Sequence, residues 1–163
     1  MTKKSTPKVS IGISAASRKK IQGMLSEILS DQHVLYIKTR NFHWNLIGGR
    51  FHSLHLYFED MYDELALAID ETAERIRMIG GTAPGSMAEF IKSASLKETK
   101  GAPITGEDAI KALLGDHETV CTSLRKHIPK IGDMDDLGTE DFLVGLLQKH
   151  EKTAWMLRSY LEG

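Results

Sequence analysis

The chain has 163 residues, which suits one domain with a sizeable core. Hydrophobic residues make up 41%, charged residues 26%, and the formal net charge is −1, so bulk disorder and a globally basic nucleic-acid binder are excluded, although a local basic patch is not. The single cysteine, Cys121, excludes an internal disulfide framework and a cysteine-based metal site within one chain. No apolar run has the length of a membrane span and no secretory leader pattern opens the sequence, so we expect a cytoplasmic protein.

The first 20 residues differ in composition from the rest of the chain. They contain six Lys or Arg side chains and no Asp or Glu, with frequent Ser and Gly and few large apolar residues. This composition predicts a flexible basic arm over residues 1–15, followed by a single helical domain over residues 16–163.

Helical periodicity dominates after the arm. A first apolar stripe predicts a helix that ends near Trp44, before a turn at residues 48–49. The stripe consists of Ile21, Leu25, Ile28 and Leu35, widened by Met24 and Leu29. A second stripe predicts a helix from about Phe51 to the glycine pair at residues 80–81, where Pro84 opposes continuation. This second helix is much longer than the usual ~11–12 residues and should pack on several partners.

A long connection and two further helices complete the predicted layout. The connection spans residues 82–105, with a short helix around Met87–Ser93. A third helix is predicted over residues 107–130, followed by an acidic turn at residues 132–138 and a last helix with Thr139 as its N-cap. No segment shows the two-residue period of a strand. Four long helices with one long middle connection predict an all-α four-helix bundle.

The second helix carries a polar stripe beside its apolar one. His55 and Glu59 lie four residues apart, and so do Asp70 and Glu74, so the members of each pair lie on one face of the helix. A carboxylate pair at this spacing can chelate a hard divalent cation, and an added imidazole favours iron, manganese or zinc.

One chain cannot bring both pairs to one metal ion. His55 and Asp70 are separated by ~22 Å along a helix that rises ~1.5 Å per residue, whereas metal–ligand bonds are ~2 Å long. The pairs can meet if two copies of the helix cross antiparallel about a two-fold axis near residues 63–65. His43 ends the first helix and can approach His55 across the turn, which predicts a site shared between two subunits.

No Glu is followed three residues later by His, the usual signature of a metal site inside one bundle. This absence favours the site shared between two subunits. A polar stripe on a long helix is also a common feature of a solvated face. His52 is interpreted as a surface residue, and the remaining histidines as packing or surface residues: His33, His117, His127 and His150. Trp44 is either a core residue or, beside a redox metal, an acceptor of oxidising equivalents.

Three motifs resemble those of the Dps family, the ferritin-like DNA-binding proteins of starved bacterial cells. These are Asn41-Phe-His-Trp-Asn45, the Leu54-His55 pair after Gly48 and Phe51, and Asp70-Glu-Thr-Ala-Glu-Arg-Ile76. The motif block spans about 40 residues. The helix layout matches the family from about residue 16 onward.

The resemblance implies a ferritin-like four-helix bundle with a short helix in its central connection, assembled into a hollow dodecameric shell. It implies ferroxidase sites at the two-fold interfaces, with His43, His55, Asp70 and Glu74 as ligands of Fe(II) and Fe(III) and two iron subsites in each site. The family usually has Asp at the position of Glu59, so the second subsite is expected to differ in affinity or geometry. Zinc is a possible substitute metal.

The implied activity is oxidation of Fe(II) by hydrogen peroxide, or more slowly by dioxygen, with storage of the ferric mineral in the cavity and protection of DNA from oxidative damage. The acidic segment before the last helix would line the three-fold pores, where Asp141 and Asp136 would attract Fe(II). Without the resemblance, the same charges are ordinary helix N-terminal residues in solvent.

The basic arm is the candidate DNA-binding element, through Lys3, Lys4 and Lys8. Such binding would use phosphate contacts, be independent of sequence and associate the protein with the nucleoid. A solubilising tail is the alternative for the arm. For the whole protein, the competing function is a non-enzymatic shell that compacts DNA.

Overall fold

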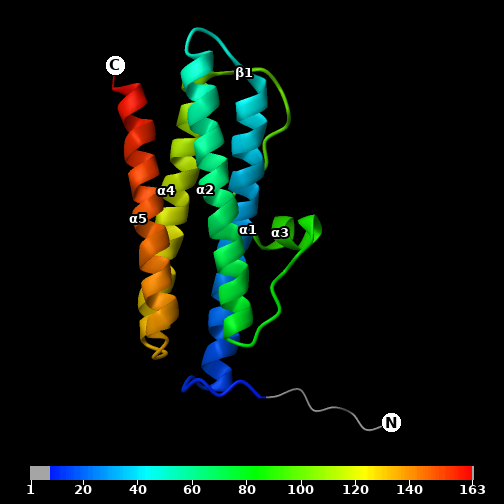
Figure 1. Cartoon of the computed structure of the whole chain (residues 1–163), viewed down its shortest axis with the longest axis vertical. Coiled ribbons are helices and arrows are strands. Elements are labelled where there is room, and N and C mark those ends of the chain that lie inside the picture. Colours follow the sequence, from blue (N-terminus) through cyan, green and yellow to red (C-terminus); the bar gives the residue numbers. More distant parts are fainter. Residues whose placement is uncertain (1–7, 163) are drawn as a thin grey trace.

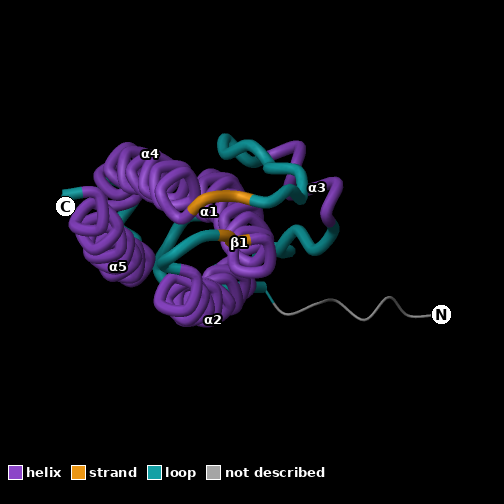
Figure 2. Tube along the Cα trace, turned by 90° about the horizontal axis from the view of Figure 1, so that it is seen from above, coloured by secondary structure: helices purple, strands orange, loops and turns teal. Residues whose placement is uncertain are grey.

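The computed structural model describes residues 8–162 and is mostly helical. Four long helices run side by side: α1 (Ala15–Asn45), α2 (Phe51–Met78), α4 (Gly106–Gly132) and α5 (Leu137–Leu161) (Figure 1). The short helix α3 (Met87–Ser93) lies in the central connection, outside the bundle and beside α1 (Figure 2). The predicted four-helix bundle is therefore confirmed. None of the described helices is long and apolar enough to cross a membrane.

The bundle consists of two helical hairpins. Helix α1 packs mainly on α2, and α4 packs mainly on α5. The four helices bury one continuous apolar core, in which Leu25, Phe42, Phe58, Leu113 and Leu157 are almost fully inaccessible. The stripe predicted for the first helix lies in this core, because its spacing of three and four residues keeps those side chains on one face.

Local sequence sets most helix ends. The Ser14 hydroxyl accepts a hydrogen bond from the Ser17 amide and begins α1, one residue before the predicted domain boundary. Ser86 and Glu89 form a reciprocal capping box at the start of α3. Helix α2 ends in a Schellman motif, in which the Gly81 amide donates to the Ile76 carbonyl and Gly80 adopts a φ of 86°.

The last helix begins earlier than predicted. Asp136, not Thr139, is its N-cap: the Asp136 carboxylate accepts a hydrogen bond of 3.0 Å from the Thr139 amide. The Thr139 hydroxyl also donates to Asp136, at 2.6 Å. Both residues are good N-caps three positions apart, and the carboxylate takes the position because Arg75 of α2 also binds it.

Two short strands were not anticipated. β1 (Leu46–Ile47) pairs in parallel with β2 (Ile104–Thr105). Two residues are too few to show a strand period in sequence. The pairing joins the end of α1, just before the turn that leads into α2, to the start of α4.

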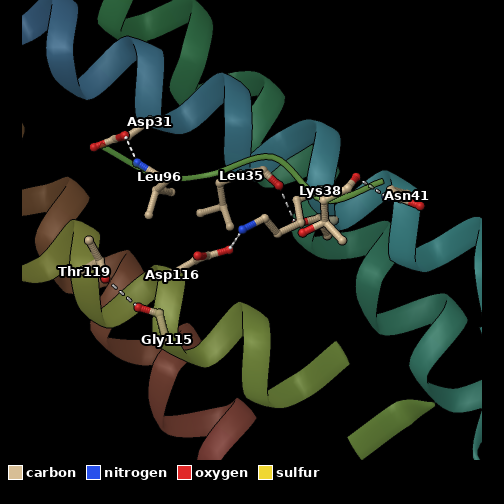
Figure 3. Close-up of polar contacts among 10 residues, drawn as sticks. Asp31, Leu35, Lys38, Asn41, Leu96, Gly115, Asp116 and Thr119 are labelled. Carbon is tan, nitrogen blue, oxygen red and sulfur yellow. Dashed lines mark hydrogen bonds and ion pairs between the residues drawn. The ribbon is translucent and has the colours of Figure 1, made fainter. Parts of the chain in front are cut away.

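Buried polar contacts fasten the central connection and α4 to α1 (Figure 3). The Asp31 carboxylate accepts hydrogen bonds from the Ser95 hydroxyl and from the amides of Ser95 and Leu96, all within 2.7–2.9 Å. Lys38 of α1 lies 2.7 Å from Asp116 of α4, and both side chains are largely buried. Burial raises the pKa of Asp116, while the Lys38 ammonium acts in the opposite direction.

Candidate metal centre

Two of the predicted ligands, His43 and His55, contact each other directly. His43 lies in the last turn of α1, and His55 in the second turn of α2. Their rings stack with centroids 3.7 Å apart and planes 20° apart. His43 Nδ1 lies 2.8 Å from the His55 carbonyl oxygen, and His55 Nδ1 lies 3.0 Å from the His43 carbonyl oxygen.

These reciprocal contacts define the chemistry of both rings. A carbonyl oxygen can only accept, so each Nδ1 must carry a proton and donate it. In a neutral imidazole, the Nε2 atom then keeps its lone pair. Metal-ligating histidines characteristically use this arrangement, in which the non-ligating nitrogen is held by a carbonyl or carboxylate. The two side chains can therefore each supply one nitrogen ligand.

An aromatic and cationic cluster adjoins the histidine pair. The Tyr62 ring lies edge-on to His43, with centroids 5.3 Å apart. The Arg40 guanidinium lies 5.0–5.5 Å from the ring centroids of Tyr36, Trp44 and Tyr62 and donates a 2.7 Å hydrogen bond to the Tyr36 hydroxyl. Partial burial raises the pKa of Tyr62, and the nearby Glu59 and Asp63 carboxylates act in the same direction.

Sequence analysis missed most of this cluster. Tyr36, Arg40 and Trp44 lie four residues apart on α1 and so share a face, which was the available signal. The interpretation of Trp44 as a core residue is wrong, because its side chain is 62% exposed. Its position beside Arg40 leaves it at the surface, near the histidine pair.

The predicted carboxylate ligands lie elsewhere on α2. Glu59, one turn after His55, is half-buried, whereas Asp70 and Glu74 are exposed and lie towards the other end of the helix. Within residues 8–162, no group of three or more His, Cys, Asp or Glu side chains gathers closely enough to hold a metal ion. The structure thus brings His43 and His55 together but does not bring Asp70 and Glu74 to them.

The two predicted pore residues have different environments. Asp136 is 2% exposed and pairs with Arg75 at 2.8 Å while capping α5, so both carboxylate oxygens have partners. This structural role was not anticipated; Arg75, which directly follows Glu74 in the motif, was the only available signal. Asp141 is exposed on the first turns of α5 and has no such partner among the described residues. The Asp136 carboxylate is therefore poorly placed to attract cations, whereas the exposed Asp141 carboxylate is available to do so.

The remaining candidates fall into three groups. Of the arm lysines, Lys8 is exposed, whereas Lys3 and Lys4 lie outside the described residues. His52 is exposed, as predicted. The other histidines have structural contacts: His33 stacks on Phe90, His127 lies 3.3 Å from a Glu27 carboxylate oxygen, and His117 and His150 contact each other.

Comparison with known proteins agrees with this architecture. Residues 22–163 match the ferritin-like domain family. A DNA protection during starvation protein of Bacillus anthracis is 38% identical over 88% of this chain and 97% of its own length. A low temperature-induced protein of Nostoc, itself uncharacterised, is 40% identical over 96% of this chain and 88% of its own. The crystal structure of a Dps protein from Vibrio cholerae, described as a member of the ferritin-like diiron-carboxylate superfamily, superposes with a TM-score of 0.90 at 30% identity, covering 96% and 99% of the two chains.

The bundle with its long central connection is thus that of a ferritin-like helical protein. Within that class, the chain belongs to the Dps family.

Proposed function

We propose that this protein oxidises Fe(II) with hydrogen peroxide, or more slowly with dioxygen, and stores the ferric product inside a hollow shell of twelve subunits. The observation that carries the proposal is the His43–His55 pair, whose reciprocal Nδ1 contacts leave two Nε2 lone pairs for a metal. The names of its Dps relatives, which refer to DNA protection and, for the Vibrio cholerae protein, to diiron-carboxylate chemistry, support it.

The site is proposed to be shared across a two-fold axis. His43, His55 and Glu59 of one subunit would face Asp70 and Glu74 of its mate. The exposure of Asp70 and Glu74, and the absence of a metal-holding group within the described part of one chain, fit this arrangement. A two-fold interface is self-complementary, so each dimer would contain two equal sites. Zinc, which accepts the same imidazole and carboxylate ligands, would compete with iron.

The proposed ligands suit iron that binds as a substrate and must leave the site after oxidation. Two Fe(II) ions supply two electrons to one peroxide, which with two protons gives two Fe(III) and two water molecules without releasing a hydroxyl radical. Carboxylates stabilise the increased charge of the ferric product. With only two nitrogen ligands, iron is held weakly enough to move on to the mineral. Removing Fe(II) and peroxide together would protect DNA.

Asp141 is our candidate for drawing iron towards the interior. Its exposed carboxylate, repeated around a three-fold axis, would concentrate cations at a pore. We assign Asp136 instead to the stability of the same segment, because its carboxylate already binds Arg75 and caps α5.

The experiment is to add Fe(II) and peroxide to the purified protein and to separate it by size-exclusion chromatography, recording protein and ferric absorbance together. We expect many irons per subunit to co-elute in a shell-sized peak. A shell-sized peak without iron would contradict the proposal and would favour the architectural alternative, a shell that compacts DNA without chemistry.

DNA binding is the one separable part of the proposal. The basic arm, with Lys3, Lys4 and Lys8, would bind phosphates from many subunits at once, and this binding would weaken steeply with salt. Deleting residues 1–7 keeps the Val9 and Ile13 contacts with the bundle and removes two of the three lysines. Retention of salt-sensitive DNA binding after this deletion would exclude Lys3 and Lys4 as its cause.

A further inference from the structure

A second histidine pair joins α4 to α5 inside the bundle, away from the proposed iron site. His117 of α4 and His150 of α5 are 3% and 4% exposed, and their Nδ1 atoms are 2.9 Å apart. One ring must donate and the other accept, so a single proton lies between the two Nδ1 atoms. Burial lowers the pKa of His117 well below its usual value and that of His150 to about 4, so both imidazoles are neutral near pH 7.

The closed pair cannot accommodate additional protons. In the neutral pair, one of the two Nε2 atoms carries a proton and the other does not. One added proton turns both Nε2 atoms into donors, but His117 Nε2 is fully buried and has no hydrogen-bond partner in the described structure. A second added proton places an N–H group on each Nδ1 atom, and two N–H groups cannot bond to each other. Protonation therefore requires the two rings to separate and reach water.

The surroundings of the pair offer little to balance a buried positive charge. The recess beside it, between α2, α4 and α5, has a volume of about 30 Å³, room for about one water molecule. The other buried walls of this recess are apolar: Met61, Leu65, Ala68 and Leu146. The charged groups on the neighbouring helices are exposed or already paired: Glu64 of α2 and Lys149 of α5 at the rim of the recess, the Lys38–Asp116 pair of α1 and α4, and the α4–α5 pairs Arg158–Glu118 and Arg125–Glu151.

We propose that the His117–His150 contact is a latch between α4 and α5 that acid releases. In water an imidazole has a pKa near 6.5, so the open state binds more protons than the closed state once the pH falls below that value. The closed state therefore loses stability as the pH falls from about 6.5 towards the lowered pKa values of the buried rings. Above this range the latch is closed and contributes its full stability.

The test measures chemical denaturation of the assembled protein at fixed protein concentration between pH 7 and pH 5. It compares the unchanged protein with the double variant His117→Leu, His150→Leu, which cannot titrate at these positions. Each proton that the open state takes up raises the unfolding constant by up to about tenfold per pH unit. We expect this constant to rise at least about tenfold more in the unchanged protein than in the double variant between pH 6.5 and pH 5. The exposed-site control His52→Gln should behave like the unchanged protein.

His150→Gln is the second variant, for use if the double variant does not assemble. Its amide oxygen can accept the His117 Nδ1 proton, and it removes one titrating group, so the pH dependence of its unfolding constant should lie between those of the other two proteins.

Hydrogen exchange of the unchanged protein locates the release. Because α4 packs mainly on α5, and α1 on α2, we expect amides of α4 and α5 near the pair to lose protection at pH 5, after correction for intrinsic rates, while α1 and α2 keep theirs. An equal pH dependence with and without the histidine pair, or a loss of protection spread evenly over all four helices, would overturn the proposal. Neither measurement uses iron, so its outcome is independent of the proposed iron site.

Discussion

His43 and His55 hold each other's imidazoles through their own main chains: each Nδ1 lies within 3.0 Å of the other residue's carbonyl oxygen. The end of α1 thereby orients a side chain of α2, and the start of α2 orients a side chain of α1. Neither ring depends on a separate residue for its tautomer. The turn between the two helices, which parallel pairing of β1 with β2 fixes at one end, is thus part of the proposed iron site.

Changing Asp70 to Ala should abolish fast iron oxidation and leave assembly intact. Its carboxylate is exposed and has no partner among the described contacts, so its removal costs little stability. As a direct ligand from the neighbouring subunit, it should contribute at least about 100-fold to the oxidation rate. Stopped-flow absorbance after mixing with Fe(II) and peroxide measures this rate. Asp60→Ala, an exposed carboxylate on the same helix, is the matched control, and normal oxidation by Asp70→Ala would refute the ligand assignment.

Changing Asp141 to Asn should slow iron uptake at low ionic strength and change thermal stability by no more than about 0.5 kcal/mol, as is usual for an exposed residue. The difference from the unchanged protein should shrink as salt rises to about 1 M, because the Debye length then falls to ~3 Å. Uptake is followed by ferric absorbance at increasing salt concentrations. An equal rate at low salt would show that Asp141 does not guide iron.

Changing Asp136 to Asn should instead lower stability and leave iron uptake little changed. The substitution removes the charge that pairs with Arg75 and weakens the cap of α5, and we expect a loss of about 2–4 kcal/mol in the free energy of unfolding. Chemical denaturation at fixed protein concentration measures it, beside Asp141→Asn. If Asp136→Asn were as stable as the unchanged protein but slow in iron uptake, the roles assigned to these two residues would be reversed.

The Lys38–Asp116 pair gives a prediction for the core. Lys38→Met leaves the Asp116 carboxylate largely buried without its cation, and we expect a destabilisation of about 3 kcal/mol. The double variant Lys38→Met, Asp116→Leu removes both charges and should recover to within about 1 kcal/mol of the unchanged protein, or exceed it. Thermal unfolding of the three proteins distinguishes these outcomes. A double variant no more stable than Lys38→Met would mean that packing, and not charge, explains the loss.

Features set by short stretches of sequence could be predicted, and those set by tertiary contacts could not. The start of α3 follows from its capping box, which lies within four residues of chain. The start of α5 was misplaced because the choice between Asp136 and Thr139 depends on Arg75, 61 residues away. For the same reason, the sequence could not distinguish the carboxylates of the acidic segment, although Asp136 is buried and Asp141 is exposed.

The histidines show the same limit at the candidate sites. The spacing of His43 and His55 across a short turn predicted their approach, and the contact between the two rings confirms it. His117 and His150 are 33 residues apart on two helices, and each alone is simply a polar residue in an apolar stripe. Their contact depends on the relative rotation of α4 and α5, which periodicity does not specify.

The most direct test of the account is complementation between two inactive proteins, because its central claim is that each iron site is built from two chains. His55→Ala breaks one half of every site, and Asp70→Ala breaks the other. If the two variants are co-assembled in equal amounts, about one quarter of the sites receive both intact halves, so oxidation should recover to about one quarter of the unchanged rate. Mixed shells as inactive as either parent would contradict a shared site.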